Sequence, residues 1–142
     1  MKIMIDTNVF LDVIFDRQIL AEASANVLDL CENSVVNGVI SASCITDIFY
    51  IVRKNLHSTD AAYDAIGQIM NLVKIGTVSE KQVKSAYSRH TSDFEDCLVA
   101  VCAESEHCDC IVTRNKNDFT DTSLKLFTPE EFISSGFQHF PD

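Results

Sequence analysis

Acidic side chains recur at the few places along the chain where buried strands are expected to end or helices to begin. Asp6 directly follows an apolar run, and Asp118 lies in the loop after a later apolar segment. Asp93 and Asp96 stand three residues apart, on one face of a predicted helix. Because strand ends and helix starts of a parallel sheet meet at one edge, we expect these carboxylates to converge there.

Converging carboxylates repel one another unless a cation neutralises them. Mg²⁺ or Mn²⁺ suits such an all-oxygen site. These ions orient a water molecule, lower its pKa and stabilise the negative charge that builds on a phosphate under attack. The acids therefore favour metal-dependent chemistry at a phosphate ester.

Other acidic residues have simpler explanations. We expect Glu95 to cap a helix, because Ser92 followed by Glu95 resembles a capping box and acids favour helix N-termini. Asp12 and Asp16 are expected to be solvated helix residues. Asp6 differs, since an aspartate that ends a buried strand is costly to place there without a partner.

Apolar periodicity predicts strands that alternate with helices. This alternation is typical of an α/β fold with a mostly parallel sheet between helices. Thr59, Ser79 and Thr128 are the expected helix caps. The predicted strands are 3–5, 39–41, 73–78, 110–113 and 126–127, and the predicted helices are 9–15, 19–37, 45–54, 60–72, one after Ser79, one carrying Phe94 inward and ending near His107, and a short one after Pro129.

Size and composition set further limits. A chain of 142 residues with 46% hydrophobic content fits one domain over residues 1–142. The net charge of −10 argues against nonspecific wrapping of nucleic acid, although it does not exclude a nuclease. Since neither a secretory signal nor a membrane-spanning run stands out, we expect a cytoplasmic protein with no membrane contact.

Most of the six cysteines lie in apolar periodic segments. We expect Cys31, Cys44, Cys97 and Cys102 to be reduced thiols of the core. Cys108 and Cys110, beside a histidine, lack a second ligand pair and are a weak zinc signal.

Four segments together resemble the successive motifs of PIN-domain nucleases, a family that includes VapC-type toxin ribonucleases. These segments are Ile5–Val9, Ile45–Asp47, Asp93–Asp96 and Ile111–Phe119, and they span nearly the whole chain in the family's order. The resemblance implies a three-layer α/β/α, Rossmann-like PIN fold with a short, mostly parallel sheet. It also implies an endoribonuclease that uses Mg²⁺ or Mn²⁺ and, for many small bacterial members, an antitoxin partner.

Carried over by position, Asp6 and Asp96 match the family's most regular metal-binding acids, and Asp118 is the nearest carboxylate to complete the metal site. Asp47 is expected to help catalysis, although the family usually has a glutamate there. Asn115 stands where an aspartate is common. An asparagine oxygen can bind a metal or its water but brings no charge.

Several polar residues near these acids are expected to support the site. Thr7, Asn8, Thr46 and Thr113 could orient water or phosphate, or could serve as caps and turn formers instead. Arg114 and Lys116 are the basic residues best placed to hold the RNA backbone. Asp93 is the remaining supporting acid.

Two alternatives to an active nuclease stay open. A degenerate PIN-like fold that binds RNA or protein is favoured by Asp47 and Asn115. An aspartyl-phosphate phosphotransfer protein would use Asp6 as acceptor, but haloacid-dehalogenase-like phosphatases need a second aspartate where this chain has Asn8, and the acid and lysine set of response-regulator receivers is not found. The apolar helices 45–52 and 61–72 could form a homodimer surface or face the core.

Overall fold

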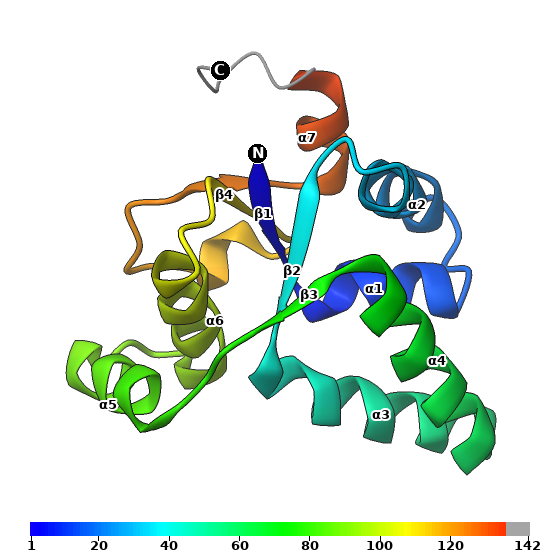
Figure 1. Ribbon diagram of the computed structural model, residues 1–142, viewed down its shortest axis with the longest axis horizontal. Helices are drawn as coiled ribbons and strands as arrows, with labels where there is room; N and C mark the ends of the chain where they lie inside the picture. Colours follow the sequence, from blue (N-terminus) through cyan, green and yellow to red (C-terminus); the bar gives the residue numbers. More distant parts are fainter. Residues whose placement is uncertain (136–142) are drawn as a thin grey trace.

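A parallel sheet lies at the centre of the fold (Figure 1). The computed structural model describes residues 1–135, and within them five strands pair in the order β3-β2-β1-β4-β5. All four pairings are parallel, which confirms the predicted sheet. The strands are β1 (Lys2–Ile5), β2 (Asn37–Ser41), β3 (Lys74–Gly76), β4 (Cys110–Val112) and β5 (Lys125–Phe127).

Helices cover both faces of the sheet and complete the predicted α/β/α layers (Figure 1). Helices α5 and α6 lie on one side, and α1 to α4 and α7 lie on the other. Residues 136–142 of the predicted domain lie outside the described part. The helices are α1 (Thr7–Ile14), α2 (Leu20–Glu32), α3 (Ala42–Leu56), α4 (Thr59–Leu72), α5 (Glu80–Arg89), α6 (Phe94–Ser105), the 3-10 helix η1 (Lys116–Asp118) and α7 (Pro129–Ser135).

The central strand β1 is the most deeply buried element. It pairs with β2 on one side and β4 on the other, so that Met4 lies opposite both Val39 and Ile111. Ile3, Met4 and Ile5 are completely inaccessible to solvent. A continuous apolar run is the expected sequence for a parallel strand with both faces covered.

Helix α6 is also buried around most of its surface, since it lies between the sheet and α5. Every residue from Cys97 to Ala103 is buried. The prediction that Phe94 points inward is wrong, because this first residue of the helix is 47% exposed. Phe94 lies at the open end of α6, ahead of the buried segment.

Several predicted element boundaries shift. Helix α2 ends at Glu32 rather than at residue 37, because Asn37 pairs with Lys2 and begins β2. Gly38 is therefore inside a strand. A Cβ atom there would lie 2.6 Å from Val73 Cγ1, so the close packing of β2 requires glycine.

Two predicted caps are also replaced by their neighbours. Ser58 rather than Thr59 caps α4, its hydroxyl accepting a 3.0 Å hydrogen bond from Ala61 N. Asp93 rather than Ser92 caps α6. The predicted cap of α7 is confirmed, since Thr128 and Glu131 each accept a hydrogen bond from the other's backbone N–H, at 3.1 and 2.9 Å.

All six cysteines are buried, and none forms a disulfide, which confirms the predicted core thiols. Burial raises the pKa of Cys110 to about 12, so this thiol stays protonated at neutral pH. In the described part of the chain, no helix is both long and apolar enough to cross a bilayer.

The strand order creates a crevice at the carboxyl edge of the sheet. From β1 the chain moves outward to β2 and β3, and it then crosses back to place β4 and β5 on the other side of β1. Open α/β sheets bind ligands where the strand order reverses in this way. Here the crevice lies beyond the ends of β1 and β4.

Candidate metal centre

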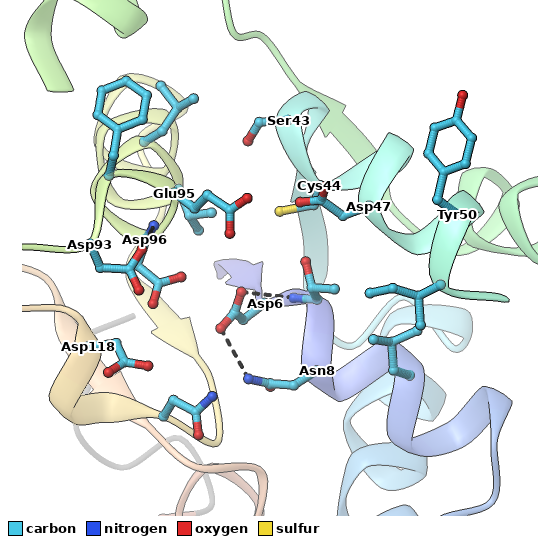
Figure 2. Close-up of a pocket in the computed structure, with 17 residues that line it drawn as sticks. Asp6, Asn8, Ser43, Cys44, Asp47, Tyr50, Asp93, Glu95, Asp96 and Asp118 are labelled. Atoms are coloured by element: carbon cyan, nitrogen blue, oxygen red, sulfur yellow. Dashed lines mark hydrogen bonds between the residues drawn. The ribbon is translucent and has the colours of Figure 1, made fainter. Parts of the chain in front are cut away.

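A cavity of about 790 Å³ opens at this crevice (Figure 2). Its walls come from the start of α1, the first turns of α3 and α6, and the loop after β4. The predicted site residues that line it are Asp6, Asn8, Asp47, Asp93, Asp96, Asn115 and Asp118.

Asp6 is fixed at the inner end of the cavity by hydrogen bonds to both carboxylate oxygens. Oδ1 accepts from Thr7 N at 2.9 Å, which makes Asp6 the N-cap of α1. Oδ2 accepts from the Thr113 hydroxyl at 2.7 Å and from Asn8 Nδ2 at 3.3 Å. Burial raises the pKa of Asp6 above its usual 3.8, and the bonds from Thr113 and Thr7 oppose the rise.

Asp93, Asp96 and Asp118 form a compact group beside Asp6. One carboxylate oxygen from each lies within 4.8 Å of the others, although Asp118 comes from a different part of the chain. Asp93 caps α6 by accepting a 3.0 Å bond from Asp96 N, which sets the two acids on the same turn. In Figure 2 the group faces Asp6 across a short gap.

Burial and mutual repulsion act together on the carboxylates of this group. Burial, followed by the charges of Asp6, Asp93 and Asp118, raises the pKa of Asp96 from 3.8 to about 7. The donors at this point are carboxylate oxygens, the hard ligands that Mg²⁺ and Mn²⁺ prefer. The residues present therefore fit a divalent cation.

The opposite wall of the cavity carries a second set of polar groups. Asp47 lies there on α3, exposed, and Figure 2 places it with Ser43 and Cys44 across from Asp96. Ser43 was not among the predicted site residues. It lies just after predicted strand 39–41, which was the available signal, and its hydroxyl is 2.6 Å from that of Ser41.

Glu95 contributes to the cavity, which its predicted capping role did not include. Asp93 rather than Ser92 is the N-cap, so the predicted capping box is not present; Glu95 lies in the first turn of α6, where acids are favoured, and its exposed side chain lines the cavity. In Figure 2 its carboxylate points toward the space between α6 and α3. Its position next to Asp96 in the first helical turn was the only signal for this placement.

The supporting residues separate into three kinds of placement. Thr113 is fully buried beneath Asp6. Asn8 joins two walls, because its Oδ1 accepts from Arg114 N at 3.3 Å while its Nδ2 donates to Asp6. Thr46 is exposed on α3 and does not line the cavity.

The two predicted RNA-binding cations are both engaged in ion pairs. Lys116 Nζ lies 2.8 Å from a carboxylate oxygen of Glu131. Arg114 Nε lies 2.7 Å from Asp12 Oδ2. The expectation that Asp12 is solvated is therefore wrong, because its side chain is completely buried and paired. Asp16 is exposed as expected, but it lies in the turn after α1 and not in a helix.

Comparison with known proteins gives consistent results. The PIN domain family model matches residues 2–117. The protein named Ribonuclease VapC1 of Aquifex aeolicus is 25% identical over 136 residues, which cover 92% of each chain.

Two solved structures share the fold. VapBC2 from Rickettsia felis, in a structure bound to a DNA fragment from the promoter, matches at 20% identity and a TM-score of 0.69 over 90% of this chain and 98% of that one. Mycobacterium tuberculosis VapC20, described as a sarcin-ricin loop cleaving toxin, matches at 12% identity and a TM-score of 0.62 over 77% of this chain and 86% of that one.

Proposed function

Since this chain belongs to the PIN domain family, we propose that it is a divalent-metal-dependent endoribonuclease that hydrolyses RNA phosphodiester bonds. The observation that carries the proposal is the convergence of Asp6, Asp93, Asp96 and Asp118 on one cavity, with the pKa of Asp96 raised to about 7. Such a group of acids is costly to assemble unless a cation binds there. The 25% identical relative named as a ribonuclease supports RNA as the substrate.

Asp6, Asp96 and Asp118 would hold Mg²⁺ or Mn²⁺, with Asp93 supporting Asp96 from the preceding turn. When bound, the ion supplies a water of lowered pKa and stabilises negative charge on the phosphate. The Thr113 hydroxyl orients Asp6 through its 2.7 Å hydrogen bond and opposes the rise in pKa that burial causes. Asp47 and Glu95 line the cavity and are available to orient the attacking water and to accept its proton.

Replacement of Asp96 by asparagine tests the site. We expect Asp96→Asn to abolish RNA cleavage and to weaken Mn²⁺ binding in calorimetry, because one charged ligand is lost. Asp64→Asn is a matched control, since Asp64 is an exposed acid on α4 that does not line the cavity. Unchanged cleavage by Asp96→Asn would exclude the proposed site.

We also infer that the chain is the toxin of a toxin–antitoxin pair. The similar VapC20 structure is described as that of a toxin, which supports this inference. Expression in bacteria should arrest growth, and the product of the adjacent reading frame should relieve the arrest. Sequencing of RNA ends after controlled expression would identify the substrate. Growth arrest that persists with Asp96→Asn would separate toxicity from cleavage.

Two observations favour a degenerate module that binds RNA or protein as the second candidate. Asp47 is one methylene shorter than the usual glutamate, and Asn115 is neutral. Such a module would bind Mn²⁺ poorly, so the same calorimetry separates the two candidates. Phosphotransfer through Asp6 is less well supported, because Thr7, Asn8 and Thr113 occupy both of its oxygens.

A further inference from the structure

A buried carboxylate on α1 takes no part in the chemistry described above. Asp12 is completely inaccessible to solvent. Its Oδ2 lies 2.7 Å from Arg114 Nε and accepts a 3.2 Å hydrogen bond from the Ser24 hydroxyl. Its Oδ1 accepts a 3.3 Å hydrogen bond from Arg17 Nη1. Both oxygens are thus partnered, which a buried charge requires.

These three partners belong to different parts of the chain. Arg17 lies in the turn after α1, and Ser24 lies on α2. Arg114 belongs to the loop after β4, which carries Asn115 and Asp118 into the cavity. One buried carboxylate therefore ties this loop to α1.

The loop is attached to the rest of the site at neighbouring points. Arg114 N donates to Asn8 Oδ1 at 3.3 Å, and Asn115 N donates to the Thr113 hydroxyl at 3.0 Å. Asp118 N in turn donates to Asn115 O at 3.0 Å, which closes the turn of η1. The position of Asp118 thus depends on the start of its loop, where the Arg114 side chain pairs with Asp12.

We propose that Asp12 and Arg114 are positioning residues for the metal site and that their ion pair holds Asp118 and Asn115 in place against Asp96. Buried ion pairs contribute little to stability compared with apolar packing, so the location of this pair under the loop is better explained by geometry. The Arg114 side chain is only 25% exposed. This role replaces the expectation that Arg114 binds RNA phosphate, and it rests on the proposed function.

Mn²⁺ calorimetry without RNA tests the proposal through Arg114→Gln. Loss of a positive charge near four acids would by itself strengthen Mn²⁺ binding. Loss of positioning would weaken it, and groups that orient metal ligands are typically worth about 10-fold to 100-fold in affinity. We expect Arg114→Gln to bind Mn²⁺ about 10-fold more weakly than the wild type.

Arg17→Gln is the matched control, because it removes a guanidinium from the same carboxylate with the same change in net charge. Arg17 lies in the segment after α1 and not in the loop that carries Asn115 and Asp118 into the cavity, so Mn²⁺ affinity should stay at the wild-type value. If Arg114→Gln fails to fold by circular dichroism, Arg114→Lys takes its place. Lysine keeps the charge but not the geometry of the guanidinium, and a several-fold loss of Mn²⁺ affinity is expected.

Wild-type affinity in folded Arg114→Gln, or in Arg114→Lys where that variant takes its place, would overturn the proposal. Equal losses in Arg17→Gln and Arg114→Gln would overturn it too, since both would then act through Asp12 alone. Unchanged Mn²⁺ affinity with a raised KM for RNA would mean that Arg114 contacts the substrate directly. Absence of Mn²⁺ binding by the wild type would instead refute the proposed function.

Discussion

Asp96→Asn should stabilise the metal-free protein at neutral and alkaline pH. The wild-type carboxyl has a pKa raised from 3.8 to about 7 by burial and by the charges of Asp6, Asp93 and Asp118. Between these two values the folded protein holds a proton that the unfolded chain has released. The wild type therefore loses stability as pH rises through this window, and the loss is complete above pH 7. Asparagine carries no charge and escapes the loss.

The size of the effect follows from the pKa displacement. One pKa step corresponds to about 1.4 kcal/mol, so the full displacement would amount to ~4 kcal/mol. Asp96 is only half-buried, and solvent screening reduces the expected gain to ~1–2 kcal/mol at pH 8. The gain should shrink as pH falls toward 5.

Urea unfolding in the presence of EDTA, at pH 5 and pH 8, measures this gain. Asp64→Asn serves as the control and should change stability equally little at both values. Added Mn²⁺ should reverse the order, because a ligand that binds only the folded state stabilises it in proportion to the logarithm of its concentration, and Asp96→Asn binds it poorly. A variant that is no more stable than the wild type at pH 8 in EDTA would refute the electrostatic argument.

Changes at four further positions test separate parts of the structure. Thr113→Val removes the 2.7 Å hydrogen bond to Asp6 and should raise the pKa of Asp6 further. The pH at which Mn²⁺ affinity falls to half its maximum should therefore be higher than in the wild type, and an unchanged value of this pH would contradict the argument. Asp47→Glu restores the longer side chain and should increase cleavage several-fold at limiting Mn²⁺, whereas Asp47→Ala should decrease it; equal rates in all three proteins would show that Asp47 takes no part. Gly38→Ala places a Cβ 2.6 Å from Val73 Cγ1 and should destabilise the fold by about 1–3 kcal/mol in urea without altering Mn²⁺ affinity. Gly67→Ala in α4, where a Cβ meets no other atom within 4 Å, should instead stabilise the fold by up to ~1 kcal/mol.

The order of strands and helices could be predicted from the sequence because it depends on local patterns. For example, the apolar run before Asp6 and the helical spacing after it can each be recognised from a few neighbouring residues. The parallel sheet then brings strand ends to one edge, so the meeting of Asp6, Asp96 and Asp118 in one cavity could be expected without coordinates.

The incorrect predictions concern residues whose surroundings depend on parts of the chain that local sequence patterns do not reveal. The sequence around Asp12 does not indicate that Arg114 pairs with it. Without such a partner, an acid on a short helix is expected to be exposed to solvent. Ser92 and Asp93 are both favourable N-cap residues, and the choice between them depends on where α6 begins. Because α6 begins at Phe94, Asp93 is the N-cap and Glu95 takes no part in a capping box with Ser92. The exposure of Phe94 follows from the same shift of the helix start.

The central place of β1 has a consequence for synthesis on the ribosome. β1 is made long before β4, one of its two neighbours, which begins only at Cys110. A nascent chain shorter than this leaves one edge of β1 unpaired and lacks both Thr113, which holds Asp6, and Asp118. The acidic pocket can therefore form only after Asp118 has been translated, and a product terminated before that residue would lack part of the proposed metal site.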